Sequence, residues 1–204
     1  AALAVPAVWQ VRSGRNAELV DLAGGIGDER AVLGRLTGGF PHAPLGEPSA
    51  GGQDGRVAET ADIVLIAGKI RESFGERGTP ARLHALGIAQ LLAGRYNDAA
   101  LSLVSASRER PGNARYLNDV ATVQLERARR GLRPDDLPRA LASADRALRL
   151  NPSLHEARFN RALALSSLSL RDQARQAWAD YLLRDADSPW ASEARGYLAQ
   201  LEQS

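Results

Sequence analysis

Residues 84–113 read HALGIAQLLAGRYNDAALSLVSASRERPGN, and this stretch decides the fold. Small residues and a closing proline stand in it at offsets of 12, 7 and 5 residues: Gly87, Ala99, Ala106 and Pro111. Leucines fill the positions between them at helical spacing. The pattern predicts two antiparallel helices that approach closely at the small residues, and a second helix that ends at the proline.

The same pattern recurs twice further along the chain. In the second copy the first offset grows from 12 to 19, so seven additional residues lie between its two helices; its positions are Ala121, Ala140, Ala147 and Pro152. In the third copy the first offset is again 12; its positions are Ala162, Ala174, Trp178, Tyr181 and Ala186. We predict helix-turn-helix units at residues 80–113, 114–154 and 155–188, and a capping helix at 189–204 that covers the last apolar face.

Helix start signals agree with these units. Thr79 before Pro80 and Ser188 before Pro189 are N-cap residues followed by a first-turn proline. We expect Asn97 to cap the helix that holds Ala99, and Ser153 with Glu156 to form a capping box.

Residues 1–79 are different in composition, because they hold 14 of the 19 glycines. Glycine destabilises a helix interior, so we predict an irregular, partly helical Gly/Pro-rich segment here. Short helices are expected at residues 16–23 and 28–36, and a long loop at residues 37–55. Residues 56–74 return to a helical pattern and are predicted to form a half-repeat.

The stretch 84–113 resembles the tetratricopeptide repeat family, whose Leu-Gly, Gly-Arg-Tyr, Ala and Pro positions it carries in register. The resemblance extends over 109 of the 204 residues, with departures in the third unit, where Tyr181 replaces an alanine and Ala186 a proline. It implies an all-α solenoid of three repeats plus a capping helix. It also implies a concave groove, lined by the first helix of each pair, that binds a peptide or protein partner.

Projecting the repeat register onto the chain gives candidate partner-binding residues in this groove. They are His84 and Ile88 in the first unit, Arg115, Asn118, Asp119, Thr122 and Glu126 in the second, and Glu156, Phe159, Asn160 and Leu163 in the third. The alternative is that their polar groups are solvated helix faces. We favour Asn118 and Asn160, because asparagine makes paired hydrogen bonds to a peptide backbone. Asp119 and Glu156 would repel a terminal carboxylate, so we expect an internal peptide or a folded partner segment.

No constellation for catalysis or for a cofactor is visible. The chain has no cysteine, and its histidines, His42, His84 and His155, are isolated from one another in sequence. Neither a phosphate-binding loop nor a G-x-S-x-G elbow is present. We therefore predict a protein that is not an enzyme and that binds no metal or cofactor.

Charge does not indicate a nucleic-acid partner. The 26 basic and 24 acidic residues leave a net charge of +2. Arginines crowd residues 126–136, ERARRGLRPDD, but acidic residues flank them and no aromatic residue stands among them, so we expect a solvated turn with local ion pairs. The apolar residues 1–11 are too short to span a bilayer. They are consistent with an upstream anchor or with a short packed helix.

The absence of methionine, also at the first position, leads us to expect a piece of a longer protein. Residues 34–44 resemble the linker before tetratricopeptide repeats in bacterial proteins that continue into a caspase-like (CHAT) peptidase or hang from a membrane. The chain would then be a regulatory arm, cytoplasmic or membrane-tethered. Self-assembly through Trp190 and Tyr197 is a further hypothesis, and compartment and oligomeric state stay open.

Overall fold

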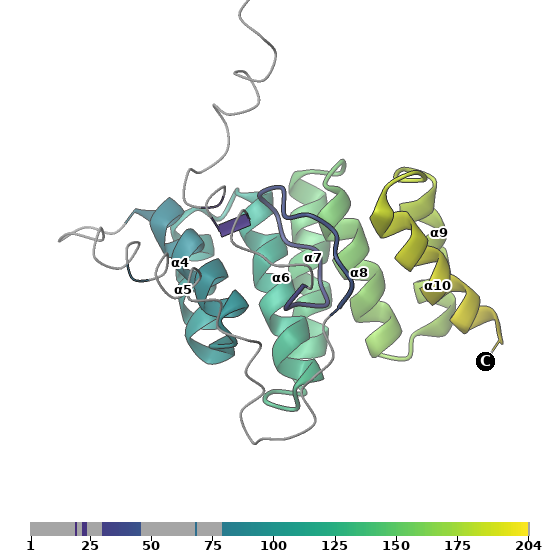
Figure 1. The fold of residues 1–204 in the computed structure, drawn as a ribbon, viewed down its shortest axis with the longest axis horizontal. Helices are drawn as coiled ribbons and strands as arrows, with labels where there is room; N and C mark the ends of the chain where they lie inside the picture. Colours follow the sequence, from purple (N-terminus) through teal and green to yellow (C-terminus); the bar gives the residue numbers. More distant parts are fainter. Residues whose placement is uncertain (1–18, 20–21, 24–29, 46–67, 69–78, 204) are drawn as a thin grey trace, which may run out of the picture.

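The computed structural model describes residues 19, 22–23, 30–45, 68 and 79–203, and the regular structure in this part is helical (Figure 1). The helices are α4 (Pro80–Leu92), α5 (Tyr96–Glu109), α6 (Ala114–Arg129), α7 (Asp136–Leu150), α8 (His155–Ser167), α9 (Arg171–Leu182) and α10 (Pro189–Gln203). Helices α4 and α5, α6 and α7, and α8 and α9 pack as hairpins, and α10 packs against α9. This confirms the predicted all-α solenoid. The division of the chain into domains stays a prediction.

The helices of each pair approach at the predicted small residues. A Cβ atom added to Gly87 would lie 2.6 Å from Cγ of Leu103, so α4 and α5 leave no room for a side chain there. The alanines at the other small positions are fully buried: Ala99, Ala106, Ala121, Ala140, Ala147, Ala162 and Ala174. Close helix packing explains why small residues recur at these offsets.

In the turn after the first helix of each pair, one residue has a left-handed backbone conformation. It is Gly94 after α4, Gly131 after α6 and Ser169 after α8, with φ of 74°, 70° and 58°. In all three turns this residue donates its N–H to the carbonyl three residues earlier, and the next residue donates to the carbonyl five residues earlier. The three pairs are therefore built alike, although only two of them carry the glycine that this conformation favours.

Aromatic side chains fill the third pair and the capping helix. Phe159 packs edge-on against Trp178, Tyr181 and Trp190 with ring centroids 5.0–5.4 Å apart, and Tyr197 stacks on Trp178. The large Tyr181, where the family has alanine, is thus part of the core between α8, α9 and α10. Trp190 is only 6% exposed, so its ring offers almost no surface for the self-assembly considered above.

Two of the predicted helix caps are confirmed and two were wrong. The hydroxyls of Thr79 and Ser188 accept hydrogen bonds from N–H groups in the first turns of α4 and α10. Asn97 does not cap α5, because that helix already begins at Tyr96. Ser153 bonds to Asn151 instead of capping α8, whose N-cap residue is Leu154.

The arginine-rich connection between α6 and α7 is held by local ion pairs, as predicted. Arg127 lies 3.1 Å from the nearly buried carboxylate of Asp136, and Arg129 lies 2.8 Å from Glu126. Arg130 also lies 3.9 Å from Glu126, so ion pairing involves three of these arginines and Asp136.

Residues 30–45 are irregular apart from an isolated bridge between Arg30 and Leu45. The predicted helix at residues 28–36 was therefore wrong over residues 30–36: the N–H groups of Leu33 and Arg35 bind side chains of α6 and α8, and that of Arg30 binds the carbonyl of Pro44. The predicted half-repeat at residues 56–74 lies outside the described residues except for Gly68. Among the helices described, none is long and apolar enough to cross a membrane.

We expect Gly87→Ala to destabilise the chain by about 1–3 kcal/mol, and Gly87→Leu by more, because a side chain there collides with Leu103. The control is Gly196→Ala in α10, where an added Cβ meets nothing within 4 Å. That change should stabilise by up to about 1 kcal/mol through helix propensity alone. Thermal melts monitored by circular dichroism measure both, and shifts of the same sign would contradict the close crossing of α4 and α5.

Ser169→Gly should stabilise the chain by about 1 kcal/mol, because glycine adopts the left-handed conformation without steric strain. The matched reverse change is Gly131→Ala, at a residue with the same conformation and open space around it, and it should destabilise by a similar amount. Each change should move Tm by roughly 2–4 °C. Equal Tm values for wild type and Ser169→Gly would show that the turn after α8 is not strained.

Candidate functional site

The first helices α4, α6 and α8 line the face predicted to form the groove, and the chain's own residues 30–45 lie on it. We name these residues the groove segment; Figure 1 shows them running across α6 and α8. The N–H of Arg30 donates to the carbonyl of Pro44 at 2.9 Å, so the two ends of the segment meet. Its buried side chains include Arg30, Val32, Leu36 and Thr37.

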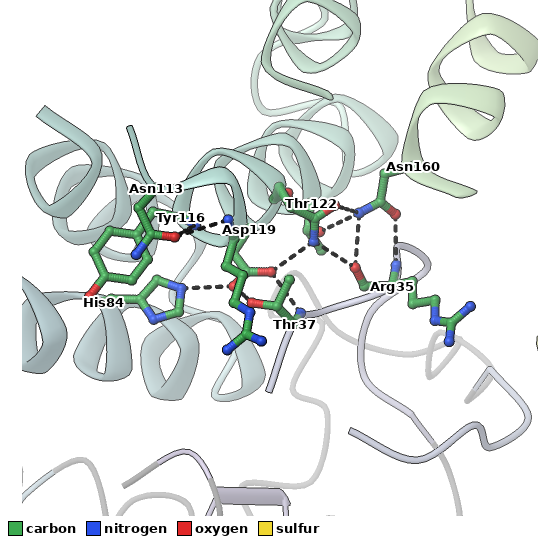
Figure 2. A network of polar contacts seen from close by, with 10 residues as sticks. Arg35, Thr37, His84, Asn113, Tyr116, Asp119, Thr122 and Asn160 are labelled. Atoms are coloured by element: carbon green, nitrogen blue, oxygen red, sulfur yellow. Dashed lines mark hydrogen bonds and ion pairs between the residues drawn. The ribbon is translucent and has the colours of Figure 1, made fainter. Parts of the chain in front are cut away.

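Two asparagines hold the main chain of Arg35 at the centre of the groove segment (Figure 2). Asn160 accepts the Arg35 N–H through Oδ1 at 2.7 Å and donates from Nδ2 to the Arg35 carbonyl at 2.9 Å. Asn118 donates to the same carbonyl at 3.0 Å, and the two asparagine side chains are themselves 2.8 Å apart. This pair satisfies both polar groups of one residue, as a neighbouring β-strand would.

The other contacts to the main chain recur at every second residue, although the segment is not a strand and bends at residues 33, 34, 37 and 38. The N–H of Leu33 donates to Oε1 of Glu126, and the N–H of Thr37 donates to Oδ1 of Asp119 at 2.9 Å. With Arg35 between them, every second N–H of the segment from residue 33 to 37 is bound by a helix side chain. The helix side chains therefore bind the N–H groups of residues 33, 35 and 37 on one side of the segment.

Asp119 connects the segment to the first helix pair. Its Oδ2 accepts the hydroxyl of Thr37 and lies 2.7 Å from Nε2 of His84 on α4. The His84 ring stacks on Tyr116 with centroids 4.2 Å apart, and Figure 2 shows these groups in one row. Since Asp119 is fully buried, its side chain needs these partners and Asn118 to offset the loss of contact with water.

Gly34 is the point of closest approach between the segment and the helices. A Cβ atom added there would lie 2.9 Å from Oδ1 of Asn160 and 3.0 Å from Cγ2 of Thr122. Both side chains are fully buried and hydrogen-bonded, so they have little freedom to move. The residue before Arg35 must therefore be glycine for the asparagine contacts to form.

The side chains of Arg30 and Arg35 reach an acidic and aromatic site on α9, α10 and the turn between them. Arg35 donates from Nη1 to the Tyr181 hydroxyl at 2.6 Å and to Asp185 at 2.8 Å, and Arg30 lies 2.5 Å from Glu193. Both guanidinium groups lie over the Trp190 ring, at 4.7 Å and 5.3 Å from its centroid. Charge and ring stacking thus favour arginine at both positions.

These contacts shift two pKa values in opposite directions. Burial, followed by the hydrogen bond to Asp185, raises the pKa of Tyr181 well above its ordinary value. Burial also raises the pKa of Asp185, but hydrogen bonds from Tyr181, Arg35 and Ser188 outweigh it and lower this pKa to about 2. Asp185 is therefore a carboxylate at neutral pH and forms an ion pair with Arg35.

The structure brings six of the predicted partner-binding residues to the groove segment, directly or through one hydrogen bond. They are His84, Asn118, Asp119, Thr122, Glu126 and Asn160. Phe159, Leu163 and Ile88 are instead buried in the cores between helices. Arg115 is exposed and Glu156 half-buried, and no hydrogen bond joins either side chain to the segment within the described residues.

Sequence reasoning missed the other half of this site. It did not place Gly34, Arg35 and Thr37 against the helices, nor did it identify Asp185 and Glu193 as partners of the arginines. The available signal was the unusual stretch at residues 34–44, interpreted as a linker. Chemically the site offers hydrogen-bond acceptors, carboxylates and an aromatic ring, which suits binding of a basic extended chain. In the part of the chain described, no cluster of His, Asp and Glu could hold a metal ion.

Comparisons with known proteins identify the fold. No family model matches the sequence, and no curated protein matches it. Among solved structures, the first TPR of Spaghetti (RPAP3), bound to the HSP90 peptide SRMEEVD, aligns with a TM-score of 0.53 at 19% identity, over 61% of this chain and 94% of that one. A thermophilic TPR protein of Thermus thermophilus aligns with a TM-score of 0.58 at 23% identity, over 69% and 73%. A tetratricopeptide repeat protein of Parabacteroides merdae gives 0.56 at 21% identity, over 71% of this chain and 56% of that one.

Asp185 predicts a specific dependence of stability on pH. Because its pKa is lowered in the folded chain, its contribution is fully present above about pH 4 and is lost as the pH falls toward 2. We expect Asp185→Asn to lower Tm at pH 6, and the difference from wild type to shrink between pH 4 and pH 2. The control, Asp98→Asn, removes an exposed pair with Arg95 and should change Tm little. A difference that does not vary with pH would contradict the ion pair with Arg35.

Proposed function

We propose that this chain, which has the tetratricopeptide-repeat fold, is a non-enzymatic protein–protein interaction scaffold that binds an extended segment against α4, α6 and α8. The observation that carries the proposal is the set of hydrogen bonds that Asn118 and Asn160 make to the main chain of Arg35. An extended peptide brings unpaired N–H and carbonyl groups, and burying them without partners costs about 1–3 kcal/mol each. These helices supply those partners from side chains.

The placement of acceptors supports a peptide as the ligand. Glu126, Asn160 and Asp119 bind the N–H groups of residues 33, 35 and 37, which lie along one edge of the segment. All three acceptors are fully buried beneath it. A helix face that contacts only water would not require amide and carboxylate groups at this regular spacing.

The comparison with Spaghetti supports the same use of the fold, because that solenoid is bound to a peptide. That peptide, SRMEEVD, ends in an acidic sequence. The site in this chain is itself acidic, through Asp119, Glu126, Asp185 and Glu193, and it holds two arginines. We therefore expect a neutral or basic internal segment as the ligand.

The alternative, a regulatory arm of a larger bacterial peptidase or of a membrane-anchored protein, concerns sequence outside this chain. Nothing in the described helices or in the groove segment favours it over a scaffold. The scaffold proposal is compatible with further domains, because it assigns a role only to the helical face.

The double variant Asn118→Ala/Asn160→Ala tests the proposal. Without these side chains the N–H of Arg35 loses its acceptor and its carbonyl loses both donors, so the groove segment should separate from the helices. We expect amide hydrogen exchange at Leu33, Arg35 and Thr37 to accelerate about 10- to 100-fold, from roughly 1 kcal/mol per hydrogen bond. Amides within α6 and α8 should stay protected.

Asn97→Ala is the matched control, because Asn97 is exposed on α5. It should leave exchange at all three segment amides unchanged. Unchanged exchange in the double variant would show that the asparagines do not hold an extended chain, and would remove the basis of the proposal.

A further inference from the structure

We infer that the partner recognised by this site is a protein segment with a Gly-Arg-aliphatic-Thr core, and that the groove segment is a built-in competitor for it. The inference rests on the proposed function and specifies its ligand. Residues 34–37, Gly-Arg-Leu-Thr, already occupy the site and show what each position of a ligand must satisfy.

The site requires glycine at the first position because it leaves no room for a side chain. Its φ is not in the left-handed region, so the requirement does not come from backbone conformation. It comes from Asn160 and Thr122, which lie 2.9 Å and 3.0 Å from the place of a Cβ atom. A ligand with any side chain at this position has to move the asparagine that binds its own main chain.

The arginine is selected by charge and shape. Its guanidinium bonds the Tyr181 hydroxyl and the Asp185 carboxylate and lies 5.3 Å from the Trp190 ring centroid. Tyr181 also donates to Asp185 at 2.6 Å, so the hydroxyl and the carboxylate are held in place for the ligand. Lysine provides a charge but no planar group to lie over the ring.

The following two positions select an aliphatic residue and a hydroxyl. Leu36 is 4% exposed and packs in the core cluster of the first helix pair. Thr37 donates both its N–H and its hydroxyl to Asp119. A ligand without the hydroxyl would leave one oxygen of this buried carboxylate with His84 alone.

The groove segment competes with any such ligand because it is part of the same chain. A tethered segment acts at an effective concentration of about 1 mM. If the untethered sequence binds with a Kd of about 10 µM, the tether reduces the apparent affinity of an external ligand by about 100-fold. External binding is therefore weak until the groove segment is released.

The test uses the full chain and a labelled peptide of residues 30–45, RAVLGRLTGGFPHAPL, in fluorescence anisotropy. Gly34→Ala changes a residue outside the helices and places a Cβ atom against Asn160 and Thr122, so it should weaken binding of the groove segment to the helices. We expect this variant to bind the peptide about 10- to 100-fold more tightly than wild type does. The control chain is Gly112→Ala, where an added Cβ meets nothing within 4 Å, and it should behave as wild type.

Peptide variants then test the core sequence on the Gly34→Ala chain. Peptides with Arg35→Ala or Arg35→Lys should bind at least about 10-fold more weakly, since a hydrogen bond to a charged group contributes about 1.5–3 kcal/mol. A peptide with Gly34→Ala should also bind at least about 10-fold more weakly, because its Cβ atom collides with Asn160 and Thr122. A peptide with Pro41→Ala should bind as the parent does, because Pro41 is exposed.

The outcomes separate this inference from the proposed function. Equal binding of the parent and Arg35→Ala peptides would overturn the selection of arginine and leave the scaffold proposal standing. Equal binding by wild type and Gly34→Ala chains would overturn the competition. Absence of binding to a Gly34→Ala chain whose segment amides exchange freely would overturn the proposed function itself.

Discussion

Burial of polar side chains on the first helices is the constraint on which the rest of the site depends. Asn118, Asp119, Thr122, Glu126 and Asn160 have no exposed surface, and each needs hydrogen-bond partners to offset its desolvation. They partly satisfy one another, His84 and Arg129 pair with Asp119 and Glu126, and residues 33–37 supply further partners from the main chain and the Thr37 hydroxyl. The helical face and the groove segment therefore supply hydrogen-bond partners to each other, and each would lose these partners if the two separated.

The repeat geometry sets the spacing of the helix side chains that bind the segment. Asp119 and Asn160 are 41 residues apart, the same offset as Ala121 and Ala162, so they occupy equivalent positions in consecutive units. Each accepts one N–H of the segment, from Thr37 and Arg35. Equivalent positions of neighbouring first helices thus bind N–H groups two residues apart in an extended chain. Helices α6 and α8 lie close enough for Asn118 and Asn160 to form a hydrogen bond.

The solenoid was predictable from the sequence because its signal is local and repeated. Gly87 and the alanines in phase with it define each helix pair within about 40 residues. The helical face was predictable for the same reason, and Asn118 and Asn160 do lie on it. The groove segment was not predictable, because its N–H groups bind side chains 82–125 residues away. The prediction of a short helix at residues 28–36 rested on local sequence alone, which contains no information about these distant acceptors.

The segment also links two parts of the core that the helices keep separate. Val32 and Leu36 belong to the cluster under α4 and α5, whereas Leu33 packs against the aromatic cluster of α8, α9 and α10. Neighbouring residues of this one short segment therefore contact both clusters. Its apolar residues provide nonspecific burial, while Gly34, Arg35 and Thr37 make contacts that depend on residue type. A ligand that replaces the segment has to reproduce both kinds of contact, which limits the sequences that can do so.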